Sequence, residues 1–283
     1  MGIFEAIKKG FGLTSKLKGL IVLFFVFNVV IGLIGLPLTN QQTMANPMII
    51  VLSIAISIVF FLIFIFLQGG ALSIVKDQLT KGSYDMADFS KNGKKFYGRI
   101  FLLLLLYVLI AIGVVLCVGA VSAGVLLLGD NIITRVIVAV IVSVVALLIM
   151  TLLIYPIYVI IVEDVGAIAS FNKGIAISKA NFGKTIGLFM SVLIISLVIS
   201  LIIGFVVGLV TAPFGTTIIA QIIIAIVNAV VQAFIPIVMM VAFMSFYLSL
   251  SGKSESATVE QEDVEKEEVV SDVDDESEET NNE

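Results

Sequence analysis

Two adjacent carboxylates, Glu163 and Asp164, directly follow a long apolar run in a chain that contains no histidine. Paired carboxyl groups can perform general acid–base catalysis, in which one group donates a proton and the other accepts one. Adjacent residues of a helix point about 100° apart, however, so these two groups cannot hold one substrate between them. We therefore favour a structural role over a functional site. Asp164 is expected to cap the N-terminus of the following helix, and Glu163 to pair with a lysine of a neighbouring segment.

The other residue types also limit the chemistry that the chain can perform. With no histidine and a single cysteine, Cys117, the chain lacks the common ligand sets for transition metals and any Ser–His or Cys–His nucleophile pair. The middle of each long apolar segment contains no ionisable residue, although membrane enzymes and ion-coupled transporters generally carry such groups there. We therefore expect no catalytic, metal-binding or cofactor-binding residue, and we expect that the protein is not an enzyme.

Amide and hydroxyl side chains are the polar groups within the apolar segments, and they include Asn28, Ser143, Thr151, Gln221, Asn228 and Gln232. Asn228 and Gln232 are four residues apart and share a helix face with Gln221. Hydrogen bonds between helices, at about 0.6 kcal/mol each on average, are the plainer interpretation of this face. The other interpretation is a polar lining for an uncharged or amphiphilic ligand.

Membrane-spanning helices must position these residues. The chain is 60% hydrophobic and 13% charged, with a mean hydropathy of +1.19. Apolar runs of about 18 or more residues are typical of transmembrane helices. We predict an all-α, polytopic membrane domain over residues 1–250, with six spans near residues 20–37, 48–67, 100–128, 132–162, 185–210 and 218–250.

Proline and glycine within these spans predict local features. Pro156 lies inside the fourth predicted span and Pro236 inside the sixth, so each of these helices is expected either to be kinked or to extend into the cytoplasm. Gly204 and Gly208 are four residues apart in the fifth span. This spacing of small residues either lets two helices approach closely or reflects the high glycine content of membrane helices.

The distribution of basic residues predicts the orientation of the spans. Fifteen of the sixteen lysines and arginines lie in the N-terminus, residues 68–99, residues 163–184 and the C-terminal tail, and only Arg135 lies on the opposite side. Because cytoplasmic segments are enriched in Lys and Arg, both termini are expected in the cytoplasm of a multi-pass protein of the cell membrane. All six tyrosines also fall toward that side, which is typical of an interfacial aromatic belt.

The same basic segments predict amphipathic helices at the cytoplasmic surface of the membrane. Apolar residues are spaced for one helix face in two of these segments, at Phe4, Ile7 and Phe11 and at Ile168, Phe171, Ile175 and Phe182. These side chains would enter the acyl boundary while nearby lysines contact anionic lipid headgroups. The expected partner is therefore the lipid bilayer and not a nucleic acid, and the sequence does not identify a protein partner.

Residues 251–283 form a segment of a different kind. From Gly252 onward the chain carries 14 acidic residues and two lysines, a net charge of −12, and few apolar residues. This composition predicts a disordered acidic cytoplasmic tail. The rest of the cytoplasmic side carries 13 basic residues. These opposite charges suggest the hypothesis that the tail competes with lipid headgroups for the basic residues.

Two stretches carry a resemblance to known proteins. "FLQGGALSIVKDQLTKGSYDMADF" contains Gly69 and Gly70 after the second span, and "YPIYVIIVEDVGAIASFNKGIAISKANFGKTIGLF" contains the Pro156 to Glu163 spacing and the aromatic and lysine residues before the fifth span. Residues 1–250 resemble the membrane domain attached to some bacterial glycerophosphodiester phosphodiesterases, and also uncharacterised six-helix prokaryotic membrane proteins. The resemblance implies a six-helix integral membrane fold. Because the phosphodiesterase catalytic domain has no counterpart in this sequence, the resemblance does not imply the hydrolase activity.

Three classes of function follow from these features, and one of them is favoured. The preferred interpretation is a non-enzymatic integral membrane protein that organises the membrane or binds a partner. The alternative is a transporter or channel for a neutral or lipid-like solute, whose polar path the amides of the sixth span could begin. A membrane enzyme would have to depend on Glu163, Asp164 and lysines at the cytoplasmic boundary.

Overall fold

The computed structural model of the chain describes residues 1–38, 47–127, 129, 131–215 and 217–252. Within these residues every regular element is a helix and there is no strand. The helices are α1 (Ile3–Thr14), α2 (Lys18–Leu38), α4 (Pro47–Thr80), α5 (Ala87–Leu127), α6 (Ile132–Leu152), α7 (Pro156–Glu163), α8 (Ala167–Ala180), α9 (Phe182–Thr211), the short η1 (Ala212–Phe214) and α10 (Ile218–Leu250). The predicted tail at 251–283 lies outside the described residues, except for Ser251 and Gly252.

Six stretches of the described chain are long and apolar enough to cross a membrane, which confirms the predicted all-α fold with six spans. Five of them correspond to α2, α4, α5, α9 and α10. The sixth combines α6 and α7 into one stretch. Such runs form helices because a helix satisfies its own backbone N–H and C=O groups where no water is available. Two helices continue beyond the predicted apolar segments, since α4 extends to Thr80 and α5 already begins at Ala87. No proline interrupts the polar residues there, so the helices do not end where the apolar runs end.

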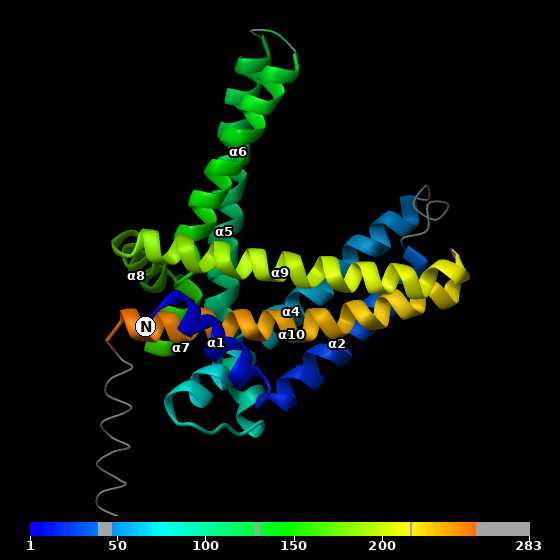
Figure 1. The fold of residues 1–283 in the computed structure, drawn as a ribbon. Helices are drawn as coiled ribbons and strands as arrows, with labels where there is room; N and C mark the ends of the chain where they lie inside the picture. The colour runs from blue at the N-terminus through cyan, green and yellow to red at the C-terminus, as the bar shows by residue number, and fades with distance from the viewer. Residues whose placement is uncertain (39–46, 128, 130, 216, 253–283) are drawn as a thin grey trace, which may run out of the picture.

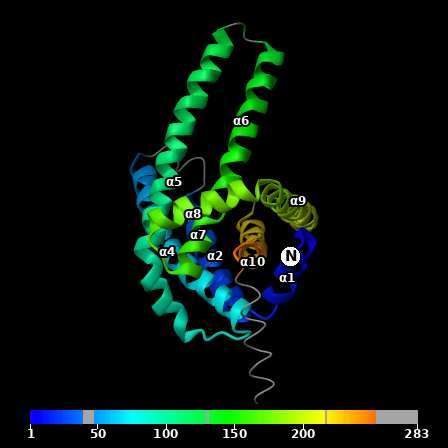
Figure 2. The same ribbon diagram turned by 90° about the vertical axis from the view of Figure 1, so that its left-hand side faces the viewer.

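The helices form three arms that meet at one base (Figures 1 and 2). One arm contains α5 and α6, the second α9 and α10, and the third α2 and α4. The second and third arms lie side by side, because α2 packs along α10, whereas the α5–α6 arm points in a different direction in Figure 1. We call the base the region formed by α1, α7, α8, the connection between α4 and α5, and the ends of the long helices that meet there. Most buried apolar side chains lie in the base, whereas most side chains of the arms are exposed and form a surface available to lipid.

Close contacts at glycine hold helices of the base together. An added Cβ at Gly10 of α1 would lie 2.9 Å from the Val238 carbonyl oxygen of α10, and one at Gly93 of α5 would lie 2.8 Å from the Phe66 ring of α4. Glycine therefore permits these helix pairs to approach closely. The two glycines with GxxxG spacing in α9 differ, because nothing lies within 4 Å of an added Cβ at either position. Their predicted role in helix approach is not seen among the described residues.

The apolar residues that we expect at the lipid boundary divide into two groups. Ile7 of α1 is buried in the core of the base, and Phe11 packs against a phenylalanine ring of α10. Phe171 of α8 packs against a tyrosine ring of α5. Phe4 and Ile168, in contrast, remain 82% and 68% exposed. Much of the predicted membrane-facing surface of α1 and α8 thus packs on the protein itself. The amphipathic pattern of these helices is the same whether the apolar face contacts lipid or protein.

The fourth predicted span is not one continuous helix. α6 ends at Leu152 and α7 begins at Pro156, because the proline ring lacks an N–H and clashes with the preceding turn of a helix. Two backbone carbonyls at the break accept side-chain hydrogen bonds, Leu152 from Ser178 of α8 at 3.2 Å and Leu153 from Tyr107 of α5 at 2.8 Å. This proline therefore breaks the helix where the sequence predicts a kink, whereas the proline inside α10 leaves that helix continuous.

Candidate functional site

The two adjacent carboxylates lie at the C-terminal end of α7, where several helices of the base meet. Their partners come from three other helices: Lys95 and Arg99 of α5, Lys173 of α8 and Tyr247 of α10. We call Glu163, Asp164 and these four partners the carboxylate junction. The break before α7 positions it, because the short helix can leave the direction of α6 and enter the base.

Glu163 is the buried member of the pair. Its side chain is only 9% exposed, and its two oxygens have different partners. The hydroxyl of the fully buried Tyr247 donates a hydrogen bond to Oε1 at 2.8 Å, and Lys173 Nζ lies 2.6 Å from Oε2. A buried phenol needs such an acceptor, since a polar group without a partner in an apolar environment is costly. Glu163 therefore ties α7 to both α8 and α10.

Asp164 is about half exposed and reaches a helix that is distant in the sequence. Lys95 Nζ lies 2.6 Å from Oδ2, and Arg99 donates to Oδ1. The hydrogen bonds from Lys95 and then Arg99 hold the pKa of the Asp164 carboxyl below its usual range. The carboxylate is consequently ionised at neutral pH, and its contribution to stability is lost only when acid brings the pH down through this lowered pKa. A group held in the ionised form in this way is not suited to act as a general acid.

A further cation contacts the end of α7. Lys76 of α4 is partly buried, and its Nζ donates to the carbonyl oxygen of Ile161 at 3.3 Å. Positive charge is favourable at the C-terminus of a helix, where backbone carbonyls have no partner within the helix. α7 is thus bound at one end by side chains from α4, α5, α8 and α10.

The structure corrects one of the two predicted roles and refines the other. Asp164 is not the N-cap of the following helix, because α8 starts only at Ala167 and its N-cap is Gly166. Asp164 is instead the C-cap of α7, with φ 56° and ψ 34°, a left-handed conformation that aspartate tolerates better than most residues. Glu163 pairs with a lysine as predicted, but this lysine, Lys173, belongs to the same cytoplasmic segment, residues 163–184, and not to a neighbouring one. It is Asp164 that pairs with the neighbouring basic segment, α5.

The chemistry of the junction is that of ion pairs and hydrogen bonds. Glu163 is bonded by Tyr247 and Lys173, and Asp164 by Lys95 and Arg99, so both carboxylates are engaged by side chains of other helices. Over the described parts of the chain, no group of three or more His, Cys, Asp or Glu side chains is arranged to hold a metal ion.

Two of the polar residues within the spans bond within their own helix, and the three amides of α10 are exposed. Asn28 and Thr151 each bond a backbone carbonyl one turn earlier in their own helix, both at 2.8 Å. Gln221, Asn228 and Gln232 all lie exposed on α10. Asn28 and Thr151 thus form these hydrogen bonds within their own helices.

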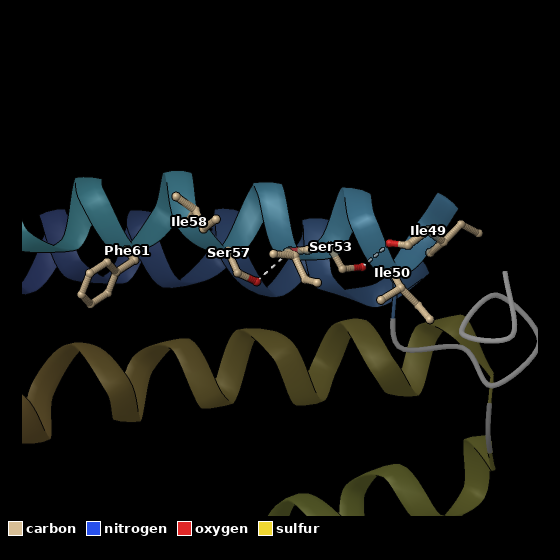
Figure 3. A pocket seen from close by; sticks show the side chains of 7 residues that line it. Ile49, Ile50, Ser53, Ser57, Ile58 and Phe61 are labelled. Carbon is tan, nitrogen blue, oxygen red and sulfur yellow. Dashed lines mark hydrogen bonds between the residues drawn. The ribbon is translucent and has the colours of Figure 1, made fainter. Parts of the chain in front are cut away.

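Two of the cavities in the described part of the chain lie along the arms, and neither is lined by the three amides of α10. The first, of about 540 Å³, is lined by residues 49–61 of α4 and includes Ser53 and Ser57. Figure 3 shows that the hydroxyl of each serine bonds a carbonyl of α4 itself, at 2.8 Å in both cases. The second, of about 240 Å³, is lined by apolar residues of α5 and α6 together with Cys117 and Ser122. The predicted polar lining for a ligand is not formed by these amides at either cavity.

Sequence reasoning did not identify Tyr247 as a site residue. The sequence predicts an interfacial belt of all six tyrosines, but Tyr155 and Tyr247 are fully buried and Tyr158 is 7% exposed. Tyr155 Oη lies 3.2 Å from the hydroxyl of Thr185, and Tyr247 donates to Glu163. A tyrosine at the basic end of an apolar span fits either location, so its pattern gives no signal that separates a lipid-facing phenol from a buried one.

Comparison with known proteins identifies the family of the membrane domain. A family model described as "Domain of unknown function (DUF7847)" matches residues 1–250. Neither the search of curated proteins nor the search of solved structures found a match. The match does not link the chain to the phosphodiesterases whose membrane domain it resembles.

Proposed function

This chain belongs to the DUF7847 family, a domain of unknown function, and we propose that it is a non-enzymatic, multi-pass protein of the cell membrane that organises anionic lipids around its base. In this proposal both termini lie in the cytoplasm and the base lies at the cytoplasmic surface. The carboxylate junction fixes the helices of the base relative to one another. The exposed lysines around it contact lipid headgroups.

One observation carries the proposal: basic residues that are distant in the sequence gather in the base. Thirteen of the fourteen basic residues in the described chain belong to it, against six acidic ones, for a net charge of +7. Arg135 is the exception and lies in the first turn of α6, at the far end of the α5–α6 arm (Figure 1). An excess of Lys and Arg on one side favours its placement in the cytoplasm.

The lysines of the base differ in how available they are to lipid. Lys95 and Lys173 are engaged by the carboxylate junction. Lys91 and Lys94 are exposed on the first turns of α5, near the junction in the sequence but not part of it. Exposed lysines at the cytoplasmic surface each favour anionic lipid by about 1 kcal/mol. Lys91 and Lys94 are therefore the best positioned to test the proposal without breaking the base.

Lipid preference provides the first test. In vesicles of phosphatidylcholine with a minority of phosphatidylglycerol, spin-labelled lipids are expected to show a stronger association of the anionic lipid with the protein. The double variant K91Q/K94Q should lower this preference, by up to about fivefold for each lysine removed. R135Q should leave it unchanged, because that charge lies at the opposite end of the arm. Equal association of both lipids with the unmodified protein and also with a chain truncated after Gly252 would contradict the proposal.

Orientation provides the second test. In a C117A background, single cysteines replace Lys94 in the base and Ile133 near the start of α6. A membrane-impermeant thiol reagent added to intact cells is expected to label the cysteine at position 133, and to label the one at position 94 only after the cells are opened. The reverse pattern would place the base outside the cell and refute the proposed orientation.

The transporter alternative has less support from the positions of the polar residues. It requires a polar path through the spans, which Asn228 and Gln232 were expected to begin. Both side chains are exposed on α10, and neither lines the two cavities along the arms. We therefore do not propose a transport function.

A further inference from the structure

We propose that the acidic segment 253–283 binds the exposed lysines of the base, such as Lys8, Lys9, Lys91 and Lys94, which we call the basic surface. The chain would then carry its own competitor for anionic lipid headgroups. This inference concerns regulation of the surface described above and rests on the proposed function. It is supported by the place where the segment begins, by its charge and by its length.

The segment begins beside the carboxylate junction. α10 ends at Leu250, and Tyr247 in its last turn donates to Glu163, which pairs with Lys173. α10 also packs along α1, which carries the exposed Lys8 and Lys9. Residue 253 is therefore attached within a few residues of a contact to the basic surface. Attachment in the same chain makes binding intramolecular, with an effective concentration that reaches the millimolar range for short flexible linkers.

The charges of the two partners are opposite and large. Residues 253–283 carry 14 acidic residues and two lysines, for a net charge of −12, and the base carries +7. Carboxylates and lipid phosphates are both anionic acceptors for the lysine ammonium group, which donates up to three hydrogen bonds. A lysine that contacts the segment is therefore less available to a headgroup. Such attraction between exposed charges weakens with salt, because the Debye length falls from about 10 Å at 0.1 M to about 3 Å at 1 M.

The segment is long enough to reach every lysine of the base. Its 31 residues span at most about 100 Å when fully extended. For comparison, α10 with its 33 residues is about 50 Å long. Lysines on α1, at the start of α5 and on α8 therefore all lie within reach of its carboxylates.

Lysine reactivity in a neutral detergent tests docking directly, without any anionic lipid. The rates at which an amine reagent modifies Lys91 and Lys94 are compared by mass spectrometry in three proteins. These are the full chain, a chain truncated after Gly252, and a full-length variant in which the 14 acidic residues of the segment are replaced by Gln or Asn. We expect both altered proteins to react at least about threefold faster than the full chain at low salt, and the difference to disappear in 1 M NaCl. Equal rates in all three proteins at low salt would overturn docking.

Lipid association then tests competition. The truncated chain and the full-length variant with the 14 acidic residues replaced should each show a preference for phosphatidylglycerol over phosphatidylcholine that is about threefold or more higher than in the full chain. If all three proteins show the same preference for the anionic lipid, competition is overturned and the proposed function stands. If none of the three proteins prefers the anionic lipid, both the proposed function and the competition are overturned. Docking of the segment is then judged from the lysine reactivities alone. The neutral full-length variant keeps the chain length, so an effect of charge is separated from an effect of truncation.

Discussion

Alanine in place of Gly174 is expected to lower the melting temperature by roughly 10 °C or to prevent folding, because overpacking of a rigid contact costs about 3 kcal/mol or more. Gly174 is buried on α8 where this helix crosses the start of α7. An added Cβ would lie 2.5 Å from the backbone nitrogen of Pro156 and 2.6 Å from its Cδ and Cγ. Neither a backbone atom nor a proline ring can rotate away, so α8 would have to move off α7.

The opposing effect of alanine is too small to cancel this cost. Alanine favours a helix over glycine by about 1 kcal/mol. G113A provides the matched control, since Gly113 lies in α5 with nothing within 4 Å of an added Cβ, and this variant should be as stable as the unmodified protein or more stable. The chain contains no tryptophan, so unfolding in detergent is best followed by circular dichroism.

A rescue experiment covers the case in which G174A does not fold. P156A removes the ring atoms Cδ and Cγ but leaves the backbone nitrogen, so P156A/G174A should recover part of the lost stability. A G174A protein that melts at the temperature of the unmodified chain would show that α8 does not cross α7 at this point.

Alanine in place of Glu163 is expected to lower the unfolding free energy by about 2 kcal/mol, or the melting temperature by roughly 6 °C. Most of this effect comes from Tyr247, whose buried hydroxyl would lose its acceptor. The ion pair contributes less, because Lys173 is 53% exposed and its charge remains hydrated when Glu163 is removed.

Two further variants separate the hydrogen bond from the ion pair. E163Q keeps an oxygen that can accept from Tyr247 and should cost less than about 1 kcal/mol. Y247F removes the donor, so that in E163A/Y247F no buried hydroxyl is left without a partner. The double variant should therefore be more stable than the sum of the two single effects predicts. If E163Q is as unstable as E163A, the charge and not the acceptor for Tyr247 stabilises the junction.

The identity of the partners of Glu163 and Asp164 shows where reasoning from the sequence ends. A carboxylate at the boundary of an apolar run, followed by lysines, predicts an ion pair, and Lys173 confirms this for Glu163. The N-cap prediction for Asp164 is wrong because the chain needs the residues up to Gly166 to turn from α7 into α8. No local pattern indicates that Asp164 would instead meet α5, about 65 residues earlier in the sequence.

Hydropathy and charge along the chain are enough to predict the number of spans and the end of each span at which the basic residues lie. Both follow from hydropathy and charge along short windows, which depend only on neighbouring residues. The packing of the helices is needed to show that Pro156 breaks the fourth span, that half of the predicted interfacial tyrosines are buried, and that the amides of α10 face outward. These outcomes depend on which helix surfaces meet, and an apolar or amphipathic face has the same pattern whether it contacts lipid or another helix.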